Sequence, residues 1–350
     1  APNVQPRVVR VVGTSPLPAP KRISFGSLQT GRHDCDYIEV VGVVQRMWLS
    51  SDPSVRTLFA DVAVEDGVVR AFFWEYSPAD LKNLIDARVR LVGNVGTIFG
   101  STGQVRGVSL FVGRTSDIDV LESAPDPFVR PVRPINSIYD YSTSGELNRR
   151  TRVRGKVTAY IPGRPVEVND FPSKATFRFE RHVIYVDDGT GAARVETEQA
   201  LRLAPGTVVD VAGFPAVTPA KPVIANAVLR VVGGGEEPQP VAIEGSLVLT
   251  PEHDALLVRM QGQFLSTLRS PTQRIFVLQV GETVFDAALE LDEPTAAGPL
   301  ERIRPGSVVA VTGVYSYQWG PAPSFRLFLR SPEDLTVLSA APWWTMRHTA

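Results

Sequence analysis

The residues best suited to chemistry lie in the segment Arg32-His33-Asp34-Cys35-Asp36, which holds an imidazole, a thiol and two carboxylates within five positions. These groups can bind a metal ion, yet ligands from adjacent positions rarely surround one. A second pair, His253-Asp254, precedes Gly262 by nine residues, just as His33 precedes Gly42. The repeated placement indicates a turn that leads into a strand, where aspartate bonds to nearby backbone. We therefore expect no metal and no cofactor here.

A second acidic segment, Asp187-Asp188-Gly189-Thr190-Gly191, has the composition of a calcium loop. A calcium loop needs ligands at alternate positions and a closing bidentate glutamate, which this segment lacks. Glu65-Asp66-Gly67 and Val280-Gly281-Glu282 occupy matching places elsewhere in the chain. Because an Asp-Gly pair between apolar strands favours a tight turn, all three segments are predicted to be hairpin turns.

Catalytic motifs are absent from the sequence. No serine lies in a nucleophile elbow, no Walker loop is present, and no histidine belongs to an HExxH helix. Four histidines in 350 residues leave few general bases. We expect this chain to bind a ligand or partner and to catalyse no reaction.

The elements that position these segments are marked by a glycine strand that recurs in two sets. The first set lies in EVVGVV, RVRGKV and RMQGQF, at Gly42, Gly155 and Gly262, and the second in RLVGNV, DVAGFP and AVTGVY, at Gly93, Gly213 and Gly313. The first glycines are 113 and 107 residues apart, and the two glycines of each repeat are separated by 51, 58 and 51 residues. Repeats of this length indicate three domains.

A helix-forming segment lies between the two glycine strands of each repeat. It is clearest at residues 77–88, where Ser77 can cap a helix and Pro78 suits the first helical position. Weaker versions span residues 197–204 and 299–304. A glycine inside a strand relieves crowding where a small barrel bends sharply. The order predicts an all-β chain of three tandem OB-like five-stranded barrels, each with a short helix.

Proline-rich linkers separate the repeats, and proline favours extended, semi-rigid spacers. Gly233, Gly234 and Gly235 are expected to make the junction between repeats two and three the looser one. Residues 7–12 are expected to form an orphan strand or an added edge of the first barrel. The predicted parts are a terminal strand of an upstream repeat plus linker (1–20), three OB-like repeats (21–125, 126–240 and 241–341) and a tail (342–350), with linkers at 16–20, 125–134 and 238–240.

Composition narrows the class of protein. The chain is 43% hydrophobic, which is enough for several cores of ordinary domain size. Its 36 basic and 37 acidic side chains give a formal net charge of −1, so no overall field attracts a polyanion. Cys35 is the only cysteine, which excludes an internal disulfide and leaves the redox compartment undecided. No apolar run is long enough to span a bilayer, so the chain as given is expected to be soluble.

Aromatic side chains are the better candidates for ligand binding, because flat rings hold ligands in barrels and clefts. Trp48 and Trp74 end two strands of the first repeat and are expected near one mouth of its barrel. Core packing remains the alternative role for every one of these rings. The candidates are Trp48, Trp74, Tyr76, Tyr315, Tyr317 and Trp319.

The second repeat has a longer connection after its first glycine strand, and in OB barrels this connection borders the ligand face. It mixes basic side chains with phenylalanines, as binding of a phosphate, a carboxylate or single-stranded nucleic acid requires. The alternative is an exposed hairpin whose alternate aromatics face the core. The basic candidates are Arg164, Lys174, Arg178 and Arg181, among Phe171, Phe177 and Phe179.

The last residues, Pro342-Trp343-Trp344-Thr345-Met346-Arg347-His348, form a distinctive ending. Paired tryptophans beside a basic residue suit a membrane interface, where the rings lie at headgroup depth. By that interpretation Trp343, Trp344 and Arg347 are membrane-proximal. The alternatives are a frayed tail, or aromatics packed against the third barrel.

This ending, after OB-like repeats and the pattern Pro20-Lys21-Arg22-Ile23-Ser24, resembles the extracytoplasmic region of bacterial two-component sensor histidine kinases. The resemblance covers essentially the whole chain, although His348 departs from the more common second arginine. It implies a periplasmic sensing region tethered to the membrane after Ala350, followed by one membrane helix and an ATP-dependent kinase core. It also implies a homodimeric receptor that responds to a small molecule or a protein ligand.

In such a receptor this region catalyses nothing, and ligand binding changes the arrangement of its barrels. The linkers, including Gly233 to Pro240, are the expected joints. Two other classes remain open. One is an OB-fold protein that binds single-stranded nucleic acid. Such a protein needs a continuous basic groove, and the balanced charge argues against one. The other is a secreted carbohydrate-binding or scaffold protein, which fits the aromatic residues.

Overall fold

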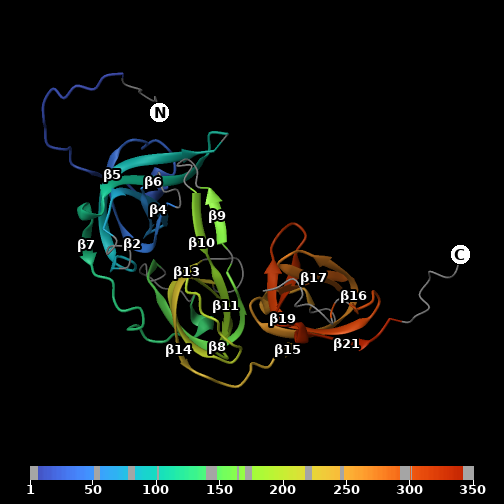
Figure 1. Ribbon diagram of the computed structural model, residues 1–350. Coiled ribbons are helices and arrows are strands. Elements are labelled where there is room, and N and C mark those ends of the chain that lie inside the picture. The colour runs from blue at the N-terminus through green and yellow to red at the C-terminus, as the bar shows by residue number, and fades with distance from the viewer. Residues whose placement is uncertain are drawn as a thin grey trace. The chain divides into compact units, whose positions relative to one another are not determined.

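The computed structural model describes residues 7–50, 56–77, 83–100, 102–138, 148–163, 165–169, 176–216, 223–244, 248–291, 300 and 302–341 (Figure 1). The chain separates into two compact units. One unit comprises Ala1–Asp126, Thr143–Arg149 and Val166–Phe179, and the other Pro127–Ser142, Arg150–Pro165 and Glu180–Ala350. The first unit contains one barrel and the second contains two, which we call barrels 1, 2 and 3 in chain order.

Barrel 1 is a closed sheet with the strand order β2-β3-β4-β6-β5, completed by pairing of β2 with β5. All its contacts are antiparallel except that between β4 and β6, which is parallel. The elements are β1 (Lys21–Arg22), α1 (Phe25–Leu28), β2 (Tyr37–Leu49), β3 (Leu58–Val64), β4 (Gly67–Glu75), β5 (Arg88–Phe99), β6 (Val105–Arg114), η1 (Thr115–Asp117) and β7 (Asp119–Glu122).

Barrel 2 repeats this order as β8-β11-β12-β14-β13, again with one parallel contact, between β12 and β14. A separate two-stranded sheet of β9 and β10 is inserted between its first two strands. The elements are η2 (Ile135–Ser137), β8 (Thr151–Ile161), β9 (Pro165–Asn169), β10 (Thr176–Glu180), β11 (His182–Asp187), β12 (Ala192–Thr197), β13 (Val208–Ala216) and β14 (Val223–Gly233).

Barrel 3 has the same order, β16-β17-β18-β20-β19, closed by pairing of β16 with β19. Its elements are β15 (Val241–Ala242), η5 (Pro251–His253), β16 (Leu257–Arg269), β17 (Gln273–Val280), β18 (Thr283–Glu290), β19 (Val308–Gln318), β20 (Ser324–Leu329), η7 (Pro332–Asp334) and β21 (Leu335–Ser339). The predicted all-β fold of three tandem OB-like five-stranded barrels is therefore confirmed.

The repeated glycines lie where neighbouring backbones approach too closely for a side chain. A Cβ at Gly42 would lie 2.4 Å from the carbonyl oxygen of Ala63, and one at Gly93 would lie 2.4 Å from that of Phe111. In barrel 3 the corresponding distance from Gly313 to the Phe328 oxygen is 2.9 Å. The predicted reason for these glycines, relief of crowding at a barrel bend, is confirmed.

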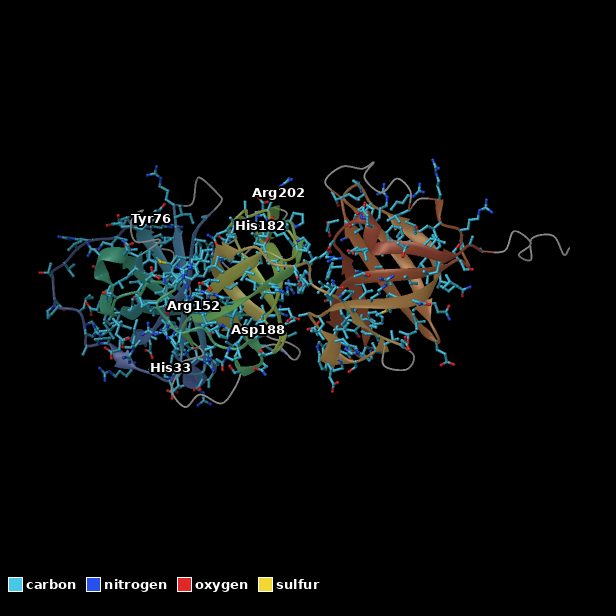
Figure 2. All side chains as sticks on the ribbon, turned by 90° about the horizontal axis from the view of Figure 1, so that it is seen from below. His33, Tyr76, Arg152, His182, Asp188 and Arg202 are labelled. Atoms are coloured by element: carbon cyan, nitrogen blue, oxygen red, sulfur yellow. The ribbon has the colours of Figure 1, made fainter. Side chains whose placement is uncertain are left out.

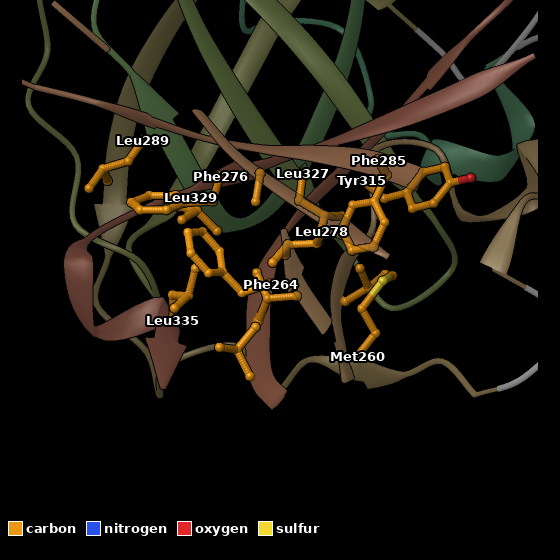
Figure 3. Close-up of a cluster of buried hydrophobic side chains, with 14 of the residues drawn as sticks. Met260, Phe264, Phe276, Leu278, Phe285, Leu289, Tyr315, Leu327, Leu329 and Leu335 are labelled. Carbon is orange, nitrogen blue, oxygen red and sulfur yellow. The ribbon is translucent and has the colours of Figure 1, made fainter. Parts of the chain in front are cut away.

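Each barrel has its own apolar core, built from the inward-facing residues of the alternating strands. In barrel 3 the core includes Met260, Phe264, Phe276, Leu327 and Tyr315 (Figure 3). The Tyr315 ring is fully buried and stacks on Phe325 at a centroid distance of 4.6 Å, and its hydroxyl donates to the carbonyl of Val248 over 3.1 Å. Tyr315 is thus a core residue.

Barrels 2 and 3 share a buried apolar contact within the second unit. Tyr185 of β11 and Phe328 of β20 have ring centroids 6.4 Å apart, and Leu257 and Val314 are buried in the same cluster. Burial of this kind holds two domains together. The prediction that the glycines at 233–235 make this junction the looser one stays a prediction.

Local predictions had mixed outcomes. The three predicted hairpins are confirmed, since β3–β4, β11–β12 and β17–β18 are antiparallel pairs joined at those turns. Residues 7–20 form no strand, so the expected orphan or edge strand at 7–12 is wrong. The expected helix at 197–204 is also wrong, because β12 runs to Thr197 and residues 198–204 form no helix. Residues 78–82 of the predicted helix at 77–88 lie outside the described residues.

Candidate ligand face of barrel 1

Aromatic side chains from four strands form a row on the side of the barrel 1 sheet that faces away from the core, where Phe59 and Phe72 are buried and Trp74 is exposed. Alternation along β3 sends Leu58 and Ala60 to the core and Phe59 to the opposite face. The same alternation along β4 buries Phe73 in the core and leaves Phe72 on the outer face. We call this row the aromatic strip; it consists of Trp48, Phe59, Phe72, Phe111 and Trp74.

Neighbouring rings of the aromatic strip touch in sequence. Trp48 stacks on Phe59 with centroids 5.6 Å apart, Phe59 meets Phe72 edge to face at 4.8 Å, and Phe72 lies 5.0 Å from Phe111. Trp74 then stacks on Phe111 at 5.8 Å with an interplanar angle of 15°. These distances and angles are those of favourable aromatic pairs. In an OB barrel the face over the second and third strands, here β3 and β4, is the usual ligand surface.

The two tryptophans of the aromatic strip differ in how much of the ring is available. The guanidinium groups of Arg46 and Arg70 each lie 5.0 Å from the centroid of Trp48, and Phe59 stacks on the same ring. Trp48 is thereby held in place by cation–π and stacking contacts. Trp74 rests on Phe111 and is 53% exposed. A flat ligand would therefore stack on Trp74.

The other two barrels lack this strip. By strand register, the positions of Trp48, Phe72 and Trp74 are taken in barrel 3 by Leu268, Ala288 and Glu290. In barrel 2 the equivalent outer face includes Tyr185, which is buried against barrel 3. The aromatic surface is therefore a property of barrel 1 among the described parts of the three repeats.

Comparison with known proteins gives only distant similarities. No family model and no curated protein matches the chain. Among solved structures, a fission yeast Pot1 complex with ssDNA is 9% identical with a TM-score of 0.28, covering 62% of this chain and 90% of that chain. A Replication Protein A heterotrimer bound to ssDNA is 8% identical with a TM-score of 0.25, covering 87% and 94%.

An aspartyl-tRNA synthetase from Entamoeba histolytica is 13% identical over 30% of this chain, with a TM-score of 0.26. The chain covers 22% of the length of this synthetase. Similarities of this size say nothing about function. The OB fold follows from the strand order and closure of the barrels themselves.

The predicted aromatic candidates do not form one site. Tyr315 is wrong as a ligand residue because it is buried in the core of barrel 3. Tyr76 and Tyr317 are partly buried and pack against the cores of barrels 1 and 3. Trp319 is 52% exposed and meets Tyr317 edge to face at 4.8 Å. Trp48 and Trp74 do belong to one surface, through Phe59, Phe72 and Phe111, which no pattern in the sequence singled out.

Of the basic candidates in the second repeat, only Arg181 has a described side chain. Its Nη1 lies 2.9 Å from Glu196 Oε2, so its charge is paired with a carboxylate of β12. Arg164, Lys174 and the side chain of Arg178 lie outside the described residues, as do Phe171 and the side chains of Phe177 and Phe179. Trp343, Trp344 and Arg347 also lie outside them, so the predicted membrane-proximal role stays a prediction.

Other arginines on the barrel surfaces are also paired. Arg152, Arg154 and Arg230 surround the fully buried carboxylate of Asp210 at distances of 2.7, 2.7 and 2.9 Å. The hydrogen bond from Arg154 is the main reason that the pKa of Asp210 is far below its ordinary value. Such pairing removes charge that a polyanion would need.

The His33 segment is a hydrogen-bonded turn. His33 Nε2 and the Ser27 hydroxyl are 3.0 Å apart, and His33 Nδ1 is 3.0 Å from Asp36 Oδ2. The Lys21 ammonium, 2.8 Å from Asp36 Oδ1, and then His33 hold the pKa of Asp36 below its ordinary value. Lys21 already neutralises this carboxylate. The contacts of His33 with Ser27 and Asp36 tie α1 to the turn before β2.

The aspartates expected to bond to their own turns instead bridge to another strand. Asp34 accepts from the amide of Thr97, and Asp254 accepts from the amide of Tyr317, both over 2.8 Å. In the described part of the chain, no group of three or more His, Cys, Asp or Glu side chains is placed to hold a metal ion. The same part contains no helix long and apolar enough to cross a membrane.

The carboxylate of Asp188 accepts hydrogen bonds from backbone amides of its own turn and from the amide of Ile135. Asp188 Oδ1 accepts from the amides of Thr190 and Gly191 over 2.8 and 3.1 Å, and Oδ2 accepts from the amide of Ile135 over 2.8 Å. Burial acts to raise the pKa of Asp188, but the hydrogen bond from the Thr190 hydroxyl and those from the three amides together lower it. The carboxylate thus fixes the turn before β12 and the preceding linker.

Proposed function

We propose that this chain is the extracytoplasmic ligand-sensing region of a membrane-anchored sensor histidine kinase, with a ligand surface on barrel 1. The observation that supports ligand binding is the exposed Trp74 ring stacked on Phe111 at the usual ligand face of an OB barrel. The sensor role is supported by the ending Pro342-Trp343-Trp344-Thr345-Met346-Arg347 after OB-like repeats. A ligand that prefers one arrangement of the units would shift the receptor between two signalling states.

The ligand class follows from the chemistry of the aromatic strip. Trp74 offers a flat apolar surface, and Arg46 and Arg70 lie at the other end of the strip beside Trp48. A small molecule with a planar or apolar face fits such a surface. A periplasmic location on a bacterial inner membrane and a homodimeric receptor belong to the same proposal.

The sensor role has a direct test in the gene. After the codon for Ala350, the proposal predicts about 20 consecutive apolar residues, enough to cross a bilayer, and then a kinase core. A stop codon, or another water-exposed domain without an apolar segment, would overturn the sensor role while leaving the ligand face of barrel 1 unaffected.

The role of the aromatic strip has a separate test in the intact receptor. Autophosphorylation in membrane vesicles should change with Trp74→Ala by about threefold or more, because two-state equilibria respond steeply to small free-energy changes. Trp319→Ala is the matched control, since Trp319 is equally exposed on barrel 3. Equal activities for the two variants and the wild type would remove the strip from the signalling mechanism.

Single-stranded nucleic acid binding is the second candidate, and the exposed ring of Trp74 is the observation that favours it, because aromatic side chains stack on bases. The described arginines near it are paired or packed, as Arg70 is with Asp61 at 2.9 Å. Quenching of tryptophan fluorescence by a thymidine oligonucleotide at two salt concentrations tests this function. Salt-sensitive quenching that is lost in Trp74→Ala would replace the sensor proposal with nucleic-acid binding.

A further inference from the structure

A cleft of about 750 Å³ lies in the second unit, between residues of barrels 2 and 3. Its volume is in the usual range for small-molecule sites, which also occur preferentially where domains meet. The walls are formed by the ends of β8, β18 and β20 and by residues 200–204, which follow β12. The partly exposed apolar residues of the lining are Ile161, Pro162 and Pro332, and the leucines beneath them are buried in the barrel cores.

His182, at the start of β11, presents a hydrogen-bond donor of fixed position to this cleft. The amide of Gly163 donates to His182 Nδ1 over 2.9 Å, so Nδ1 must be an acceptor without a proton. The Tyr160 hydroxyl, 2.7 Å from Nδ1, therefore donates as well, and its ring stacks on the imidazole. The remaining nitrogen, Nε2, carries the hydrogen of the neutral ring. It lies 3.5 Å from Glu180 Oε1, beyond a normal hydrogen bond.

Arg202 supplies a cation on the same wall, and Figure 2 shows it on the same side of barrel 2 as His182. Its side chain is exposed, and the part of the chain that the structure describes gives it no hydrogen bond or ion pair. Arg330, the other arginine of the cleft, is committed to Asp334 at 2.6 Å and to Glu237 at 3.1 Å. Arg202 is therefore the cation that can serve a ligand.

We propose that this cleft binds a small monocarboxylate with an apolar tail. The carboxylate would take hydrogen bonds from the Arg202 guanidinium and from His182 Nε2–H, while the tail packs against Ile161, Pro162 and Pro332. This site is separate from the aromatic strip, and the two proposals can fail independently.

Two acidic side chains limit the charge that the cleft accepts. Glu180 is half-exposed beside His182, and Glu290, which accepts a hydrogen bond from Gln273, also lines the cleft. These carboxylates would repel a second negative charge, so dicarboxylates and phosphates should bind more weakly than monocarboxylates. The same reasoning predicts that Glu180→Gln strengthens monocarboxylate binding.

Isothermal titration of the full chain with hexanoate, 1-hexanol and hexylamine tests the proposal. Hexanoate should bind at least about tenfold more tightly than the other two, because its carboxylate gains charge-assisted hydrogen bonds. Arg202→Gln should weaken hexanoate binding by about tenfold and leave 1-hexanol unchanged. Arg302→Gln is the control, since Arg302 holds the corresponding place before Pro305-Gly306 in barrel 3 and is also exposed.

A second variant keeps the test independent of the arginine. Ala204 lies exposed at the cleft, so Ala204→Trp should fill it and abolish hexanoate binding without disturbing a core. No hexanoate binding at millimolar concentrations, unchanged affinity in Arg202→Gln, or stronger binding of hexylamine would each overturn the proposal.

Discussion

At the scale of single residues, Asp210 shows how strongly one buried charge can organise a barrel. Its carboxylate is fully buried on β13 and accepts hydrogen bonds from arginines 152 and 154 on β8 and 230 on β14. Removing its charge leaves three guanidinium groups close together without a counter-ion. A broken buried ion pair of this kind typically costs about 3–5 kcal/mol.

We therefore predict that Asp210→Asn lowers the free energy of unfolding of the second unit by about 3 kcal/mol or more, measured by urea denaturation at pH 7. Asp286→Asn is the control, because Asp286 pairs with Arg326 at a partly exposed site in barrel 3. Its expected cost is about 0–1 kcal/mol. Similar losses for both variants would contradict the role assigned to burial.

The pH dependence of the same carboxylate follows from its pKa. Because the folded pKa of Asp210 lies far below the ordinary value of 3.8, its contribution to stability is present above that value and is lost as the pH falls below about 4. Urea denaturation at pH 7 and pH 3 should show a smaller difference between the wild type and Asp210→Asn at the lower pH. A constant difference would show that the arginines do not depress this pKa.

At the scale of strands, the repeated glycines set how closely the barrels can close. An added Cβ would lie 2.4 Å from the Ala63 oxygen at Gly42 but 3.1 Å from the Gln279 oxygen at Gly262. Contacts below 3.0 Å against backbone require the strands to separate. Replacing the glycine by alanine should therefore cost more stability in barrel 1 than in barrel 3, although the local sequences are alike.

We expect Gly42→Ala to destabilise barrel 1 by about 3 kcal/mol and Gly262→Ala to destabilise barrel 3 by about 1 kcal/mol, both measured by chemical denaturation. Gly26→Ala in α1 is the control, since a Cβ added at Gly26 would meet nothing within 4 Å. Equal effects at Gly42 and Gly262 would mean that the strands relax as easily in both barrels.

At the scale of the whole molecule, the contact between barrels 2 and 3 depends on an uncharged tyrosine. Burial raises the pKa of Tyr185 from 10.0 to about 12. A raised pKa means that Tyr185 contributes its stability fully below pH 10 and loses it as the pH rises from 10 to 12. The shared apolar cluster with Leu257 and Val314 should weaken over the same interval.

Comparison with Tyr185→Phe tests this prediction. The phenylalanine keeps the ring and its stack on Phe328 but cannot ionise. The stability of Tyr185→Phe relative to the wild type should therefore increase when the pH is raised from about 8 to about 11. Thermal melts at the two pH values measure the change. If the difference between the two proteins does not change with pH, Tyr185 is not held in an apolar contact.

The linker between barrels 2 and 3 gives a further expectation at this scale. Added Cβ atoms at Gly233 and Gly234 meet nothing within 4 Å, and the barrels touch through Tyr185 and Phe328. Gly234→Pro should therefore leave the unfolding transition of the second unit unchanged in a calorimetric scan. A lower melting temperature would show that the linker itself restrains the barrels.

The sequence by itself determined the repeated unit. Paired glycines, Asp-Gly turns and alternating apolar residues are local signals, and they specified three five-stranded barrels and their hairpins because strand bends and tight turns depend on the residues that form them. The sequence overestimated the helices, since residues 198–204 after β12 form none.

Only the tertiary structure decided which residues meet. Alternation gives each strand two faces, but it does not say that Trp48 and Trp74 are joined through Phe59, Phe72 and Phe111, or that Tyr315 points inward. Nor does it show that barrel 3 covers the outer face of barrel 2 at Tyr185, or that His182 and Arg202 line one cleft. These contacts join residues far apart in the chain, and packing between elements selects them.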